Sequence, residues 1–83
     1  MSLAGSGKAR LALALPRYRT SLRLAGGREF MELFEQYALA SLAIEAMQRE
    51  THCSGEMLSR FRELCLDIQA DVVQLLDRRL MNY

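Results

Sequence analysis

Apolar positions near the C-terminus of the chain follow the period of an α-helix. Between residues 55 and 80 they recur at alternating steps of three and four residues, which places them along one side of a helix. This first stripe consists of Leu58, Phe61, Cys65, Ile68, Val72 and Leu75. The pattern predicts a long amphipathic helix over residues 55–80 with one buried face.

A second apolar stripe runs beside the first on the same predicted helix. It consists of Leu66, Val73 and Leu80 at steps of seven, with Leu76 filling in between. A helix with two apolar stripes needs two neighbours, and the chain offers one clear partner helix. We therefore expect the second stripe to bind a partner, either a second copy of the chain or a helix of another protein.

Residues 28–50 predict that partner helix, because their apolar positions have the same period. Its two rows are Phe30, Tyr37 and Ile44, and Leu33, Ala40 and Met47. The run 37–44 contains no charged residue, so we expect the middle of this helix to be enclosed on most sides. Ser54 is a favourable N-cap for the second helix, which leaves a short turn at 51–54.

These patterns predict an all-α fold built on an antiparallel hairpin of two long helices, over residues 28–83. The 83 residues form one domain with a marginal core. A lone hairpin would leave the second stripe in water, and self-association is a common way to enlarge a small core. We therefore expect two hairpins to dock as the four-helix bundle of a homodimer.

Residues 1–27 form a basic arm whose conformation the pattern leaves open. In the extended interpretation, leucine alternates with alanine from residue 11 to 15, and larger side chains alternate with arginine or serine from 18 to 24. The helical interpretation places Leu11, Leu15, Tyr18 and Leu22 on one face. Pro16 disfavours an unbroken helix but suits a first helical turn, so we favour a short helical or irregular arm packed on the hairpin. Residues 1–7, rich in glycine and serine, are expected to be mobile, and the two glycines at 26 and 27 predict a break.

Charge is divided unevenly between the arm and the hairpin. Residues 1–28 carry six basic residues and no acid, a net +6, whereas residues 29–83 carry five bases and ten acids, a net −5; together they give the chain's +1. The arm can lie on the acidic body and neutralise it. Alternatively Arg17, Arg19 and Arg23 can contact phosphates while Tyr18 stacks on a base, which predicts a nucleic-acid-binding regulator.

Two resemblances concern the arm. An arm followed by two helices has the element order of the ribbon-helix-helix repressors, although the predicted helices here are longer. Tyr18-Arg19 followed by Leu22-Arg23 is similar to the Leu-Tyr-Arg motif of small mitochondrial assembly factors, which are three-helix chains. Arg17 stands where that motif has leucine, the double glycine interrupts the pattern, and the body is acidic where that family is basic. This similarity covers about six residues and does not assign the chain to the family.

Candidate chemistry is sparse, and we expect no catalytic residues, no metal and no cofactor. His52, Cys53 and Cys65 are the only histidine and cysteines, one ligand short of a structural zinc site. The glycines before Lys8 lack the spacing and the following hydroxyl of a phosphate-binding loop. Acidic residues of the second helix are interleaved with basic and amide residues, which is typical of a solvated face.

The predicted function is therefore that of a small helical protein–protein interaction module, such as an adaptor, a chaperone-like subunit or a regulator. Two cysteines without a disulfide pattern suit a reducing cytoplasm. The longest candidate membrane run is far too short to cross a bilayer, so no membrane partner is expected.

Overall fold

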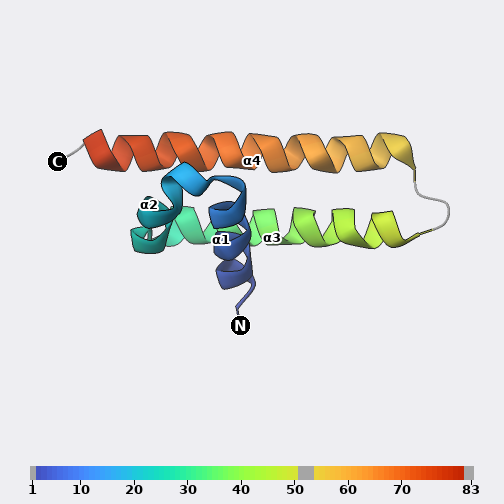
Figure 1. Cartoon of the computed structure of the whole chain (residues 1–83), viewed down its shortest axis with the longest axis horizontal. Coiled ribbons are helices and arrows are strands. Elements are labelled where there is room, and N and C mark those ends of the chain that lie inside the picture. The colour runs from blue at the N-terminus through green and yellow to red at the C-terminus, as the bar shows by residue number, and fades with distance from the viewer. Residues whose placement is uncertain (1, 51–53, 82–83) are drawn as a thin grey trace.

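The computed structural model describes residues 2–50 and 54–81, the last two by their backbone alone. Within these ranges it contains helices and no strand, which confirms the predicted all-α class (Figure 1). In chain order the elements are α1 (Leu3–Ala14), a 3-10 turn (Pro16–Tyr18), α2 (Arg19–Leu24), α3 (Arg28–Arg49) and α4 (Gly55–Met81).

The two long helices, α3 and α4, run antiparallel beside one another (Figure 1). Gly27 caps the start of α3 with φ 103°, a left-handed conformation that glycine adopts without strain. At the start of α4 the Ser54 hydroxyl accepts a hydrogen bond from the Met57 N–H at 3.3 Å, which confirms the predicted N-cap. The turn predicted between the helices falls largely on residues 51–53, outside the described residues.

The first stripe of α4 packs against α3, as predicted. Its buried members are Cys65, Ile68, Val72 and Leu75, and Leu58 and Phe61 are partly buried toward the turn. The uncharged run of α3 is enclosed less completely than expected. Ala38 and Ala40 are buried, but Leu39 and Leu42 are exposed, because no described element covers the outer side of α3 there.

The N-terminal segment, residues 2–25, is helical, and the extended interpretation is wrong. Leu11 and Leu22 are fully buried, and Leu15 and Tyr18 pack against the same core. Leu13, which an alternating strand would have buried with Leu11, is exposed. Pro16 occupies the first turn of the 3-10 segment, where its missing N–H leaves no hydrogen bond unmade.

The expectation of a mobile start at residues 1–7 needs correction, because α1 begins at Leu3. The Ser2 hydroxyl caps this helix by accepting the Gly5 N–H at 3.0 Å. Ala4 and Gly7 lie on the buried side, where α1 crosses α3. A Cβ atom at Gly7 would overlap the backbone carbonyl of Phe34, so glycine here permits a close approach of two helices rather than flexibility.

Two phenylalanines of α3 form the centre at which the elements meet. The rings of Phe30 and Phe34 are stacked with their centroids 5.8 Å apart. The Lys8 ammonium lies 5.9 Å from the Phe34 centroid, and the Arg79 guanidinium lies 5.5 Å from the Phe30 centroid. These are cation–π distances, so the paired rings link α1 and the end of α4 to α3.

Lys8 also closes the end of α2. Its ammonium donates hydrogen bonds to the carbonyl oxygens of Arg23 at 3.0 Å and Ala25 at 3.2 Å. Carbonyls at a helix C-terminus have no partner within the helix and carry partial negative charge. A cation from α1 therefore stabilises the turn that leads into α3.

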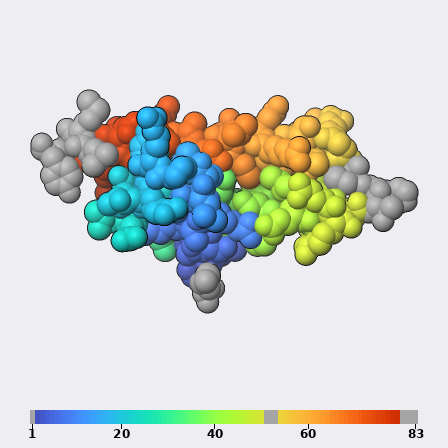
Figure 2. Space-filling model, viewed as in Figure 1, coloured from blue at the N-terminus to red at the C-terminus, as the bar shows by residue number. Residues whose placement is uncertain are grey.

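The N-terminal segment covers only part of the hairpin (Figure 2). It lies over the first half of α3 and the last half of α4, and it leaves uncovered the distal half, which we define as residues 41–49 and 55–66. The molecule measures 50 × 25 × 21 Å with a radius of gyration of 13.6 Å, against about 12 Å for a compact domain of this length. None of the described helices combines the length and apolar character needed to cross a membrane.

The crossing at Gly7 predicts a strong effect of one methyl group. Gly7→Ala should lower the free energy of unfolding by about 1–3 kcal/mol or more, because the helices must separate to admit the Cβ. Gly55→Ala, whose Cβ would meet no atom within 4 Å, should leave that free energy unchanged or raise it by up to about 1 kcal/mol. Chemical denaturation followed by circular dichroism measures both. Equal stability of the two variants would contradict the close crossing.

Candidate functional site

The second stripe of α4 is divided by the fold into a covered and an uncovered part. Leu66 is 62% exposed, Val73 is partly buried and Leu76 is only 4% exposed. The side chain of Leu80 lies outside the described residues. The expectation of one continuous accessible stripe therefore needs correction at Leu76.

The physical reason is that the chain supplies the second neighbour itself. Leu76 belongs to the same core cluster as Leu11 and Leu22 of the N-terminal segment. The helical face of that segment forms a third layer over the last half of α4. This layer does not cover Leu66, which lies about two helical turns closer than Val73 to the connection between α3 and α4.

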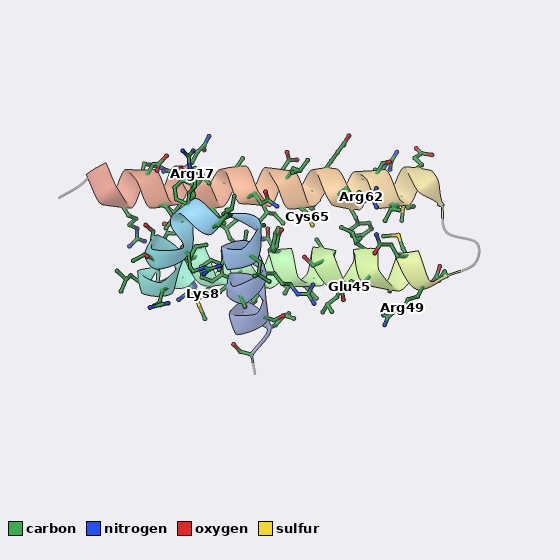
Figure 3. All side chains as sticks on the ribbon, in the orientation of Figure 1. Lys8, Arg17, Glu45, Arg49, Arg62 and Cys65 are labelled. Carbon is green, nitrogen blue, oxygen red and sulfur yellow. The ribbon has the colours of Figure 1, made fainter. Side chains whose placement is uncertain are left out.

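A groove of about 450 Å³ opens at the point where this cover ends. It lies between the C-terminal half of α1, α3 and α4, and Figure 3 shows Cys65, Arg62 and Glu45 on the side of α1 that faces the uncovered hairpin. We call it the docking groove. Its lining consists of Arg10, Tyr37, Ser41, Ile44, Glu45, Arg62, Cys65 and Leu66.

The floor of the docking groove is mostly apolar. Tyr37 and Cys65 are buried and Ile44 is partly buried. Burial raises the pKa of the Cys65 thiol, and a hydrogen bond with Ser41 opposes that shift without cancelling it. The thiol is therefore protonated at neutral pH, and the side chain forms a small apolar part of the groove floor. At the end of the floor Gln69 donates a hydrogen bond to the Tyr37 hydroxyl at 2.9 Å, which ties α4 to α3.

The rim of the docking groove is charged. The Arg10 guanidinium forms an ion pair with the Glu45 carboxylate, with Nη1 and Oε1 2.7 Å apart. This hydrogen bond lowers the pKa of Glu45 and raises that of Arg10. Arg62 lies on the opposite rim, exposed, and no described residue forms an ion pair with it. The groove thus presents an apolar floor, one neutralised charge pair and one cation without a described partner.

The arm residues predicted to contact nucleic acid are not brought together as one set. Arg17, Arg19 and Arg23 are exposed, and across residues 2–50 and 54–79 none of them forms an ion pair. Tyr18 instead packs against the core, which removes the predicted stacking partner for a base. Neutralisation of the acidic body by the arm is limited, among the described contacts, to the pair between Arg10 and Glu45.

Metal-ligating residues form no cluster in the described part of the chain, where no three histidine, cysteine, aspartate or glutamate side chains could hold an ion together. His52 and Cys53, which the sequence singled out, lie outside the described residues. Cys65 is buried in the floor of the docking groove, with 9% of its surface exposed.

The ion pair between Arg10 and Glu45 could not be predicted from the sequence. The two residues are 35 positions apart, and nothing in the local period of either helix predicts their contact. Only the crossing of α1 over α3 brings them together. The helical period of the sequence identified Tyr37, Ile44 and Cys65 as members of the apolar rows between the two long helices. It did not identify them as the floor of a groove.

Comparisons with protein-family models, with curated protein sequences and with solved structures each find no match. No family assignment follows from them.

The lowered pKa of Glu45 predicts how the rim responds to pH. A carboxylate whose pKa is lower in the folded state stabilises the fold above its ordinary pKa of about 4.5, and this contribution is lost as the pH falls through the lowered value. Glu45→Gln should therefore melt below the wild type at pH 7, and the difference should vanish in acid. Thermal unfolding across pH 2–7 measures this.

Glu35→Gln is the matched control, since Glu35 is an exposed carboxylate on the same helix without an ion pair among the described residues. It should leave the melting temperature at pH 7 nearly unchanged. A Glu45→Gln difference that persists undiminished at the lowest pH would refute the ion pair as its cause.

Proposed function

We propose that the chain is a small helical protein–protein interaction module that receives an amphipathic helix of a partner protein in the docking groove. The observation that supports this most directly is the exposed Leu66 beside an apolar groove, at the point where the third layer of the fold stops. A partner helix laid there would continue that layer over the distal half. This mode of binding buries one apolar helix face in a groove between two helices.

The magnitudes are adequate for such a contact. A groove of about 450 Å³ lies within the range of about 300–1,000 Å³ common for binding pockets. Complete burial of one leucine contributes about 1.5–3 kcal/mol, so Leu66 together with a partner leucine seated in the groove provides a substantial part of a micromolar affinity. The protonated Cys65 adds no charge that would oppose this burial.

The rim gives the groove a preference of sign. Arg10 is already neutralised by Glu45, whereas Arg62 has no described ion-pair partner. A partner helix with an acidic residue next to its apolar face would pair with Arg62. Rim charges of this kind affect the association rate and the choice of partner more than the affinity.

The proposal includes self-association of the hairpin as the four-helix bundle of a homodimer, and no catalytic activity. A reducing compartment such as the cytoplasm suits a chain whose buried Cys65 is a free thiol. An adaptor, a chaperone-like subunit and a regulator all act through such surfaces.

The groove assignment is tested with matched baits. Immobilised wild type should retain a partner that Leu66→Asp fails to retain, because the substitution places a carboxylate against the apolar floor. Leu39→Asp changes another exposed leucine outside the groove and should retain that partner. Calorimetric titration of the purified partner should then show at least about tenfold weaker binding to Leu66→Asp, a loss of about 1.4 kcal/mol or more. Equal binding by all three proteins would contradict the proposal.

An alternative function is binding of nucleic acid by the arm. The observation that favours it is the exposure of Arg17, Arg19 and Arg23 without ion pairs among the described residues. Arg19 and Arg23 are one helical turn apart in α2, so they share a face that can follow a phosphate backbone. This interaction would be electrostatic, because Tyr18 packs inward.

Fluorescence anisotropy with single-stranded RNA and duplex DNA of random sequence decides the alternative. Binding should weaken steeply with added salt, with a slope close to the number of phosphates contacted. Replacing Arg17, Arg19 and Arg23 by glutamine should abolish it and leave the circular dichroism spectrum unchanged. Binding that is insensitive to salt, or that survives the triple substitution, would exclude the arm as its site.

A further inference from the structure

One wall of the docking groove is α1, and the groove follows the direction of that helix. α1 crosses the hairpin, with its start on the outer side of α3 and its end directed toward α4 (Figure 1), and its Arg10 lines the groove. On α4 the lining covers about one turn, from Arg62 to Leu66, or about 6 Å. The axes of packed helices are about 8–10 Å apart, and the groove extends from α3 to α4. A helix seated against α1 in this groove therefore crosses both helices of the hairpin.

Two exposed leucines lie at the α3 end of this path. Leu3 precedes Arg10 by seven residues, so both lie on one flank of α1, and Leu3 is 37% exposed. Leu42 precedes Glu45 by three residues on α3 and is 42% exposed. Because Arg10 and Glu45 are in contact, the flank of α1 that carries Leu3 adjoins the side of α3 that carries Leu42. A helix that crosses here covers both leucines.

Two further exposed leucines lie at the α4 end of the path. Leu13 follows Arg10 by three residues, in the last turn of α1, and is 76% exposed. Leu66 lines the groove on α4 and is 62% exposed. Leucines at both ends of the groove indicate that its natural occupant is long enough to contact all four, which a helix of about three turns can do.

α1 itself shows which kind of helix crosses this hairpin. Its buried residues are Ala4, Gly7 and Leu11, at steps of three and four. The small residues permit the close approach to α3, where Gly7 lies against the carbonyl of Phe34, and Leu11 enters the core that α3 and α4 share. The accepted pattern is therefore a small residue over α3 and a large apolar residue toward α4.

The next crossing position beside α1 suits the same pattern. On α3 the groove presents Ser41, a small residue, and the ion pair between Arg10 and Glu45 leaves the middle of the path without net charge. At the α4 end, Arg62 lies on the groove side of Leu66, whereas Glu63 is not part of the lining. An occupant can therefore place a carboxylate opposite Arg62 without opposing another acid in the groove.

We propose that the partner helix lies across the hairpin beside α1 and packs on α1 as well as on α3 and α4. It carries a small residue where it passes Ser41, large apolar residues on either side of it, and an acidic residue next to the one that meets Leu66. This rests on the proposed function and adds the class of partner helix and its orientation.

The competing orientation is a helix that lies along the hairpin as a third parallel layer. Such a helix would pass over Gln48, one turn beyond Ile44 on α3, and over Leu58, one turn before Arg62 on α4. It would leave Leu3 and Leu13 exposed. The crossed orientation covers these two leucines, which is why the arrangement of exposed residues favours it.

A display library of helical peptides with one randomised face provides the probe. The library is selected on immobilised full-length chain and depleted on the Leu66→Asp variant. Enriched peptides should share two large apolar residues about seven positions apart, as in the spacing of Ala4 and Leu11 in α1, with a small residue between them and an acidic residue at one end.

Fluorescence anisotropy of one enriched peptide then tests the orientation. Leu3→Asp and Leu42→Asp should each weaken binding about tenfold or more, because each sets a carboxylate against an apolar contact. Aspartate at the first position of α1 is compatible with the helix dipole. Gln48→Asp, on the competing path, and Leu24→Asp, at a leucine of α2 that is 80% exposed, should bind the peptide as the wild type does.

A second pair of variants tests the acidic residue of the partner. Arg62→Glu should weaken binding of the same peptide about tenfold, because like charges then meet at the rim. Arg60→Glu makes the same change of charge at an exposed arginine of α4 that pairs with Glu56 outside the groove, and it should bind as the wild type does. Equal losses in both variants would overturn the contact at Arg62.

Amide chemical shifts of the wild type keep the orientation testable even if a variant fails to fold. Addition of the peptide should shift the amides of residues 3–13 in α1 together with those of 41–45 and 62–66. Shifts confined to residues 41–49 and 55–66, with α1 unchanged, would overturn the crossed orientation.

The outcomes separate this inference from the proposed function. Peptides that bind and that Leu66→Asp fails to bind, but that respond to Gln48→Asp and not to Leu3→Asp or Leu42→Asp, overturn the orientation and leave the docking groove in place. A selection in which no enriched peptide depends on Leu66 overturns both.

Discussion

The structure depends on one close backbone crossing, that of α1 over α3 at Gly7. Without a Cβ at this position, α1 approaches the Phe34 carbonyl closely enough for neighbouring side chains to reach their partners. Lys8 then lies over the Phe34 ring and closes the end of α2, and on the other side Arg10 reaches Glu45. The position of the third layer, and hence the boundary at which the docking groove opens, follows from this contact.

The third layer is shorter than the hairpin that it covers. The 12 residues of α1 span about 18 Å and cross the hairpin instead of following it, whereas α4 has 27 residues, or about 40 Å. Half of the hairpin is therefore two helices thick, and each of its apolar stripes meets water at some point. The 62% exposure of Leu66 is a consequence of this mismatch in length. The proposed binding of a partner helix depends on this uncovered half.

Local periodicity predicted what depends on neighbours along the chain. The bounds of α3 and α4, the buried stripe from Cys65 to Leu75 and the cap at Ser54 follow from spacing and capping chemistry within a few residues of each position. The third layer followed only in part. The helical face of Leu11, Leu15, Tyr18 and Leu22 indicated a short arm packed on the hairpin, but the start of α1 was missed, because residues 4–7 have small side chains whose role depends on what lies opposite. The absence of a side chain at Gly7 suggested mobility, whereas in the structure it allows the backbone of α1 to contact the backbone of α3 at Phe34. The burial of Leu76 and the pair between Arg10 and Glu45 depend on that layer and were inaccessible for the same reason.

The change from three layers to two along the hairpin also implies a gradient of local stability. Where the N-terminal segment, α3 and α4 pack together around Phe30 and Phe34, opening any helix exposes the shared core, and backbone amides there should exchange with solvent only through nearly global unfolding. Toward residues 41–49 and 55–66, fewer contacts oppose fraying, and amides can exchange through local opening. A helix bound in this half would suppress that opening, so the chain would stiffen where it is occupied while its core changes little.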